Sequence, residues 1–244
     1  MRYFINLSYK GTNYHGWQIQ ANASTVQSVL NDALSILLGE TILTTGAGRT
    51  DTGVHAARFT AHFDSLRLAD FPENPGVVHK LNGILPDDIC VADVVPMPDD
   101  AHARFDAVSR TYKYYIHTHK NPFLTEVSTW IPFPLNRQAM NDAAQMLSQY
   151  TDFTSFAKLH TQTKTNLCRI TQAVWEPTDS GLVFTISSNR FLRNMVRAIV
   201  GALIDVGRGK ISCDDMRRII EQKNQFGVGY SVPAKGLFLT EISY

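Results

Sequence analysis

The chain has 244 residues, of which 44% are hydrophobic and 18% are charged, and its formal net charge is +1. This composition suits a soluble globular protein of one large or two small domains, and no apolar run approaches the ~18 residues that span a membrane. A net charge near zero excludes a uniformly basic surface but allows a local basic groove. Its three cysteines lie far apart with no CxxC pair, which argues against disulfides and a thiolate zinc site and fits a reducing cytoplasm.

The first half alternates between strand and helix patterns. A strand is predicted over 3–9 because Tyr3, Ile5, Leu7 and Tyr9 share one face. The next helix has a capping box at Ser24 and Gln27 and a stop at Gly39. The remaining elements expected here are strands over 41–45 and 57–63, a short helix near 76–85 and a strand over 88–95.

The second half repeats this order. Its expected elements are a strand over 110–118, a helix over 135–149 with Asn136 as its cap, strands over 166–175 and 181–188, a helix that Asn189 caps and that runs to about 206, a helix over 213–223 and a last strand over 236–244. Strand, helix, two strands, helix and strand is the split βαβ order. We therefore expect an α+β fold of two ferredoxin-like halves, 1–105 and 106–244, with antiparallel sheets merged around a central catalytic cleft.

The stretch GAGRTDTGVHA, residues 46–56, concentrates chemistry between glycines. Arg49 precedes Asp51 by two residues, and a neighbouring guanidinium favours the ionised carboxylate. An ionised carboxylate in a cleft is a nucleophile or a base. The residues alone equally allow a surface pair between Arg49 and Asp51 in an ordinary turn.

Several segments in a fixed order resemble one enzyme family. These segments are GRTDTGVHA (48–56), YKGTNYHGWQIQ (9–20), HARFDA (102–107), RTYKYYI (110–116), DFTSF (152–156), FLRNMVRAIVGALIDVG (191–207) and PAKGLFLTEISY (233–244). They are similar to the motifs of the tRNA pseudouridine synthase A family and span nearly the whole chain. Lys10 departs from the pattern, since the family commonly has an aspartate there.

The resemblance implies roles for four residues. Asp51 matches the family's catalytic aspartate, and Arg197 matches an arginine that pairs with it, a role for which Arg49 is the other candidate. Tyr112 matches a tyrosine that stacks on the target uracil, as aromatic side chains do in nucleic-acid sites. An ordinary core tyrosine is the alternative for Tyr112, and Tyr114 and Tyr115 are expected in the core.

Basic residues are expected to bind the RNA. Arg190, Arg193 and Arg197 are spaced three and four apart, which predicts one side of a helix with no acid nearby. Arg190 and Arg193 are therefore candidates for phosphate contacts. The residues that would extend this surface are Arg58, His102, Arg104 and Lys158.

The implied reaction converts uridine to pseudouridine near positions 38 to 40 of the tRNA anticodon arm. It requires no cofactor, because nothing is oxidised and no energy source is consumed, and the histidine and cysteine spacings predict no metal site. The target base must be turned out of its stem. The family's members act as homodimers, with one tRNA touching both subunits.

Two other functions remain open. A nucleosidase with an aspartyl nucleophile would release free uracil, and an RNA-binding module without catalysis would not need Asp51. If the chain is an isomerase, the carboxylate either adds to the uracil ring or stabilises the sugar cation. The sequence does not identify the group that accepts the C5 proton.

Overall fold

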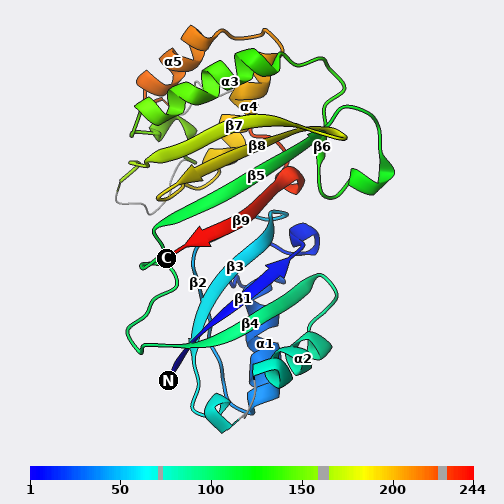
Figure 1. The fold of residues 1–244 in the computed structure, drawn as a ribbon, viewed down its shortest axis with the longest axis vertical. Helices are drawn as coiled ribbons and strands as arrows, with labels where there is room; N and C mark the ends of the chain where they lie inside the picture. The colour runs from blue at the N-terminus through cyan, green and yellow to red at the C-terminus, as the bar shows by residue number, and fades with distance from the viewer. Residues whose placement is uncertain (71–73, 159–164, 225–229) are drawn as a thin grey trace. The chain divides into compact units, whose positions relative to one another are not determined.

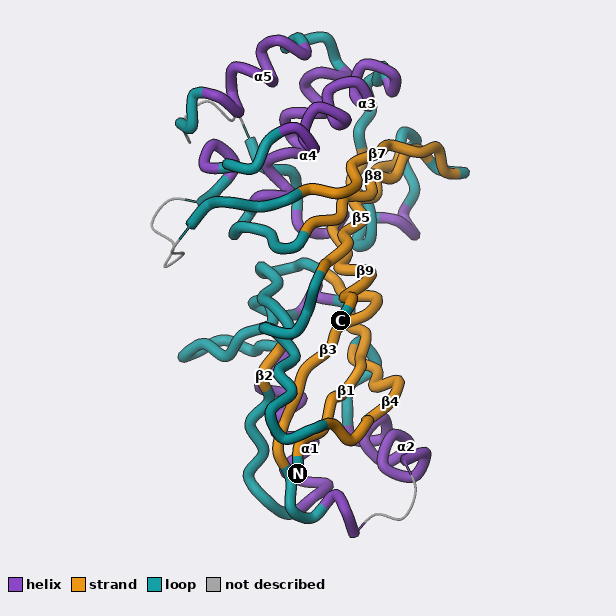
Figure 2. The backbone as a smooth tube through the Cα atoms, turned by 60° about the vertical axis from the view of Figure 1, so that its left-hand side comes forward, coloured by secondary structure: helices purple, strands orange, loops and turns teal. Residues whose placement is uncertain are grey.

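The computed structural model describes residues 1–70, 74–158, 165–224 and 230–244 (Figure 1). The chain forms two compact units: unit 1 comprises residues 1–108 and 238–244, and unit 2 comprises residues 109–237. Each unit combines strands with helices, so the mixed α and β content is confirmed (Figure 2). Residues 238–244 group with unit 1, although they follow unit 2 in the sequence.

Unit 1 contains a sheet in the order β4–β1–β3–β9. Its strands are β4 (Ile89–Met97), β1 (Arg2–Tyr9), β3 (His55–Asp64) and β9 (Leu237–Ser243). Strand β1 is antiparallel to β3 and β4, whereas β9 runs parallel to β3. The short β2 (Thr45–Gly46) pairs with β3, so the strand predicted over 41–45 is mostly an irregular segment.

Two helices of unit 1 are α1 (Val26–Leu38) and α2 (Asn74–Ile84). The capping box of α1 lies one residue later than predicted, because the Thr25 side chain accepts from the Ser28 N–H and Ser28 bonds back to the Thr25 backbone. Gly39 ends α1 with a φ of 62°, as predicted. The predicted inward face of β1 is confirmed: Tyr3, Ile5, Leu7 and Tyr9 are all buried.

Unit 2 contains an antiparallel sheet in the order β5–β8–β7. Its strands are β5 (Ser109–His117), β8 (Gly181–Ser188) and β7 (Ile170–Thr178), with β6 (Thr129–Trp130) paired to β5. Its α-helices are α3 (Arg137–Met146), α4 (Met195–Gly207) and α5 (Cys213–Glu221). Asn136 caps α3 through the Ala139 N–H, as predicted.

The start of α4 corrects the sequence analysis. Asn189 does not cap this helix; its Oδ1 accepts a hydrogen bond from the Arg169 N–H (2.7 Å). The helix begins at Met195, after Asn194 with a φ of 67°. Arg190 and Arg193 therefore lie before the helix, and only Arg197 of the three arginines lies on it.

Short 3-10 helices complete the described elements, at Gly11–Asn13, Leu68–Asp70, Pro122–Leu124, Leu147–Gln149, Thr154–Phe156 and Ala234–Gly236. Within the described ranges, no helix has both the length and the apolar character needed to cross a membrane.

Candidate active site

Asp51 opens a tight turn that leads into β3. The Val54 N–H donates to the Asp51 carbonyl oxygen (3.1 Å), and Gly53 has a φ of 78°. A turn that needs a positive φ at its third residue favours glycine there. Asp51 is partly buried, whereas Thr50 and Val54 beside it are buried. The turn thus holds a carboxylate-bearing residue at the border between core and solvent.

The loop that follows β1 is hydrogen-bonded to this turn. The Trp17 N–H donates to the Thr50 carbonyl oxygen (3.2 Å), and the Gly53 N–H donates to the Tyr14 carbonyl oxygen (3.3 Å). The hydroxyls of Tyr9 and Thr50 share a further bond (2.8 Å). Two segments about 40 residues apart in the sequence, 9–17 and 50–55, therefore form one hydrogen-bonded structure.

His55 links the same two segments from the core. Its ring is 1% exposed, and its Nδ1 accepts the Gly11 N–H (2.9 Å). The ring also stacks on Phe238 of β9, with 4.5 Å between centroids. Sequence reasoning gave His55 no such role, although the glycines of YKGTNYHGW signalled a close approach of backbones.

Arg49 lies two residues before Asp51 in the same loop. Arg49 is exposed, whereas Asp51 is partly buried. The two residues therefore differ in their access to solvent.

Three further predicted residues belong to unit 1. Arg58 is exposed on β3, where the period of two places it on the face of Thr60 and His62. His102 and Arg104 lie in the connection after β4. The His102 ring lies 4.6 Å from the ring of His62 and 4.1 Å from that of Phe105.

Unit 2 holds the predicted tyrosine. Tyr112 is partly buried on β5, and its ring meets Phe191 edge to face at 5.1 Å. Tyr114 is fully buried, as predicted, and its hydroxyl donates to the Pro233 carbonyl oxygen (2.8 Å). Tyr115 is only partly buried, so its assignment to the core was wrong. Tyr112 differs from Tyr114 in retaining a solvent-accessible side.

Arg197 is fixed by a reciprocal pair of bonds. Its Nε donates to the Val232 carbonyl oxygen (2.7 Å), and the Val232 N–H donates to the Arg197 carbonyl oxygen (3.3 Å). One nitrogen of the guanidinium thereby sets the direction of the other two. Such a preset guanidinium suits binding of a carboxylate or phosphate.

Basic residues converge around the segment 189–193, which we call the basic segment. The Lys158 N–H donates to the Arg193 carbonyl oxygen (3.2 Å), so Lys158 lies beside Arg193. Arg110 donates to the Asn189 carbonyl oxygen (3.0 Å), and Arg169 bonds Asn189 through its backbone. The structure thus places Lys158 beside Arg193, in the segment that also contains Arg190, and adds Arg110, which sequence reasoning did not single out.

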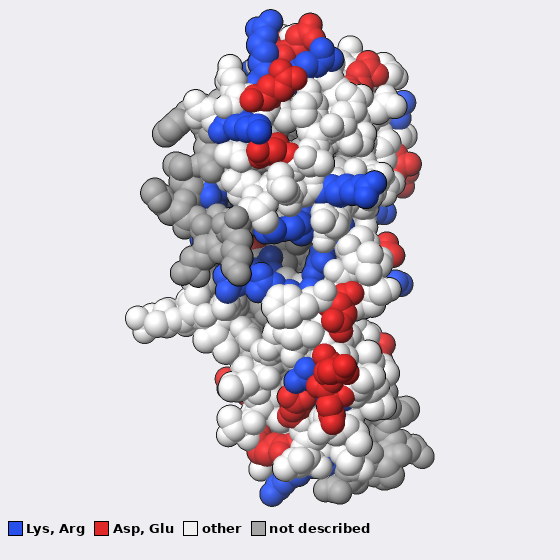
Figure 3. Space-filling view, turned by 90° about the vertical axis from the view of Figure 1, so that its left-hand side faces the viewer, with Lys and Arg blue, Asp and Glu red and all other residues white. Residues whose placement is uncertain are grey.

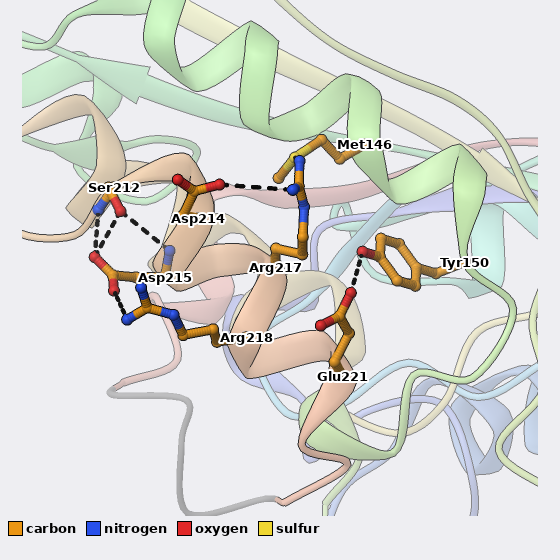
Figure 4. Close-up of polar contacts among 8 residues, drawn as sticks. All are labelled: Met146, Tyr150, Ser212, Asp214, Asp215, Arg217, Arg218 and Glu221. Carbon is orange, nitrogen blue, oxygen red and sulfur yellow. Dashed lines mark hydrogen bonds and ion pairs between the residues drawn. The ribbon is translucent and has the colours of Figure 1, made fainter.

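The arginines of α5 are arranged differently. Lys and Arg side chains alternate with Asp and Glu side chains at the end of unit 2 that carries α5 (Figure 3). Figure 4 shows Arg217 beside Asp214 (3.6 Å) and Arg218 bonded to Asp215 (3.1 Å). These internal pairs make α5 a poor phosphate-binding surface.

Cys168 is a buried cysteine of unit 2. Burial raises the pKa of Cys168 to about 11, so its thiol is protonated at neutral pH. Among the residues that the structure describes, no three His, Cys, Asp or Glu side chains form a metal-binding group.

Comparison with known proteins adds independent information. Residues 143–244 match a family described as tRNA pseudouridine synthase. Three similar proteins carry the name tRNA pseudouridine synthase A. The one from Azobacteroides pseudotrichonymphae is 52% identical over 243 residues, covering 100% of this chain and 96% of the relative. Those from Bacteroides fragilis and Bacillus subtilis are 53% and 38% identical, with 100% of this chain and 96% and 99% of the relatives covered.

Proposed function

The chain belongs to the tRNA pseudouridine synthase A family and isomerises uridine to pseudouridine in tRNA, and we propose that Asp51 is the catalytic residue of this reaction. The partly buried position of Asp51, in a turn that the loop 9–17 holds by backbone bonds, supports this role. Catalytic groups require such fixed placement, because small displacements reduce the rate strongly.

The reaction needs four events. The bond between uracil N1 and ribose C1′ breaks, the ring turns, C5 bonds to C1′, and the C5 proton leaves while N1 gains a proton. Asp51 either adds to the ring or stabilises the sugar cation. We assign Tyr112 to stacking on the uracil and Arg197, with Arg49, to holding the carboxylate.

The substrate is proposed to be the anticodon arm at positions 38 to 40. Phosphates there would meet the basic segment, and Arg58, His102 and Arg104 of unit 1 would add contacts. The target uridine must leave its stack before it reaches Asp51, at a cost of a few kcal/mol that binding offsets. Such an enzyme would act in the cytoplasm on newly made tRNA.

We propose a homodimer in which one tRNA touches both subunits. Its support is the connection between β5 and α3, which exposes three aromatic side chains. Phe123 is 90% exposed, Trp130 47% and Phe133 49%. Exposed apolar side chains that gather in one patch mark interaction sites. Sedimentation of wild-type protein and of the variant Trp130→Ser would then show a dimer and a monomer, respectively.

The test of the function is incubation with an unmodified tRNA transcript, followed by carbodiimide mapping of pseudouridine. The proposed function predicts a stop at positions 38 to 40 and an unchanged RNA mass. Release of free uracil would instead identify a nucleosidase, and binding without conversion an RNA-binding module.

A further inference from the structure

The turn formed by residues 102–106 is fixed by hydrogen bonds at every backbone N–H. The N–H of His102 donates to Asp106 Oδ2 (2.7 Å), and that of Ala103 donates to His62 Nδ1 (3.1 Å). The N–H groups of Arg104 and Phe105 both donate to His102 Nδ1, and that of Asp106 donates to the His102 carbonyl oxygen. A turn so completely bonded is held in one conformation.

The base of this turn is anchored in the core of unit 1. Ala103 is fully buried against Phe4 and Ala47, and its carbonyl oxygen accepts the Tyr244 hydroxyl (2.8 Å). Burial lowers the pKa of His62 to about 4, so its ring is neutral and Nδ1 stays an acceptor near neutral pH. The anchored turn therefore keeps its shape without help from a ligand.

Phe105 is the large apolar side chain that this turn presents to solvent. It is 74% exposed, and its ring lies against the His102 ring at 4.1 Å. The Arg104 guanidinium lies over the Phe105 ring, 5.7 Å from its centroid. A large aromatic ring held out of the core adds little to stability, whereas a rigid ring beside a cation is the usual platform for a nucleic-acid base.

The platform formed by Phe105 and Arg104 follows a residue, Ala103, that packs in one cluster with the segment leading to Asp51. Ala47, which packs against Ala103, is four residues before Asp51. Phe4 stacks on His62, and the period of two along β3 puts Arg58 on that face as well. RNA that reaches the Asp51 turn would therefore pass a surface that carries Arg58, Arg104 and Phe105.

We propose that Phe105, with Arg104 beside it, is a stacking site for an unpaired base of the tRNA substrate, separate from the uridine that reacts. This inference rests on the proposed function for the identity of the RNA. A base is favoured over a protein segment because the ring is paired with a guanidinium, which can contact a phosphate or stack in turn. Stacking tolerates any base, so this site would add affinity without reading sequence.

The test compares four substitutions at one position in the full chain. Phe105→Ala should weaken binding of unmodified tRNA about 5- to 150-fold, as expected for loss of one stacked base. Phe105→Tyr and Phe105→Trp keep a ring and should bind nearly as well as wild type. Phe105→Leu should fall between, because it keeps apolar area but not the π-face. The salt dependence of binding should not change in Phe105→Ala, since no charge is removed.

Two controls keep the outcome specific. Leu66→Ala removes another strongly exposed apolar side chain of unit 1 and should leave both tRNA affinity and melting temperature unchanged. Melting of Phe105→Ala should also match wild type. Equal affinities of Phe105→Ala and wild type would overturn the proposal, as would equal losses in the Tyr, Leu and Ala variants. A change in sedimentation without a change in tRNA affinity would instead identify a protein contact and would also overturn it.

Failure of this inference is distinct from failure of the proposed function. If wild-type protein makes pseudouridine and Phe105→Ala binds tRNA normally, only the stacking site is wrong. If wild-type protein binds tRNA but makes no pseudouridine, the catalytic proposal is wrong, while the binding series at Phe105 still tests the platform.

Discussion

The backbone N–H of Trp17 donates a hydrogen bond to the carbonyl oxygen of Thr50, the residue before Asp51 (3.2 Å). This approach is so close that a Cβ on Gly16 would lie 2.3 Å from the same oxygen, and Gly16 has a φ of 88°. The placement of the Asp51 turn therefore depends on a residue 35 positions earlier in the sequence.

Gly16→Ala should lower the free energy of unfolding by about 1–3 kcal/mol, because the new side chain both strains the backbone and collides with Thr50. Gly48→Ala is the matched control, since a Cβ at Gly48 meets no atom within 4 Å. It should leave stability unchanged or raise it by up to ~1 kcal/mol. Urea unfolding of both variants measures the difference, and equal losses would show that the close approach is not limiting.

Asp51→Asn should abolish pseudouridine formation and leave tRNA affinity nearly intact. Asparagine keeps the shape of the side chain but loses its charge and its nucleophilicity. Single-turnover assays and filter binding measure the two properties separately. Turnover near the wild-type rate would remove Asp51 from the mechanism.

Tyr112→Phe separates two roles of one side chain. The ring that would stack on the uracil remains, so affinity should barely change. Its hydroxyl, which we propose accepts the C5 proton or positions the group that does, is lost, and turnover should fall about 10²- to 10⁴-fold. Tyr112→Ala should lose affinity as well. Were Tyr112 only a core residue, Phe would be harmless and Ala would chiefly lower the melting temperature. Full activity of Tyr112→Phe would leave the ring as a platform and place the proton acceptor elsewhere.

The basic segment should account for part of the salt dependence of tRNA binding. In Arg190→Ala/Arg193→Ala, the slope of log affinity on log salt should fall by about 0.7–0.9 for each lost phosphate contact. Arg217→Ala/Arg218→Ala removes the same charge from α5, where Asp214 and Asp215 already pair both arginines. Its slope should match wild type. An equal fall in the slope for both double variants would show that net charge, and not the basic segment, determines binding. An unchanged slope in Arg190→Ala/Arg193→Ala would show that these arginines contact no phosphate.

Stability should depend on pH through His62. Its pKa is lowered to about 4, chiefly by burial, against a usual value near 6.5 in the unfolded chain. The unfolded state therefore binds the extra proton first, and His62's contribution to stability is full above about pH 6.5 and is lost progressively as the pH falls toward 4. The limiting slope is about 1.4 kcal/mol per pH unit.

His62→Asn isolates this effect, because the Asn Oδ1 stands near the position of Nδ1 and does not titrate. Urea unfolding between pH 5 and 7 should show a shallower pH dependence in the variant than in wild type. Parallel curves would mean that His62 does not stay neutral in the folded protein.

Local sequence predicted local structure well. The alternation of Tyr3, Ile5 and Leu7 gave the buried face of β1, and the bounds of β8 coincide with the predicted 181–188. Helix capping is also local, but Ser24 and Thr25 are adjacent before α1 and either could cap it. The reciprocal hydrogen bonds between Thr25 and Ser28 identify Thr25 as the cap.

Long-range contacts explain what the sequence did not predict. Asn189 is a residue type that commonly caps helices. Its side chain instead accepts a hydrogen bond from the Arg169 N–H, 20 residues away in the sequence. The ring nitrogen Nδ1 of His55 likewise accepts a hydrogen bond from the Gly11 N–H, 44 residues away in the sequence. The motifs identified Asp51, Tyr112 and Arg197 as candidates, but the loop that holds the Asp51 turn required the folded chain.

Strand β9 has a consequence for the order of synthesis. Its pairs His55↔Phe238 and Ala56↔Leu239 lie just after the Asp51 turn, so unit 1 takes its last strand from residues that follow the whole of unit 2. A ribosome translates residues 109–237 before it reaches them. During the entire synthesis of unit 2, the nascent chain therefore contains the Asp51 turn without strand β9 beside it. A messenger RNA broken within that region yields a unit 1 that lacks β9 and has an open sheet edge.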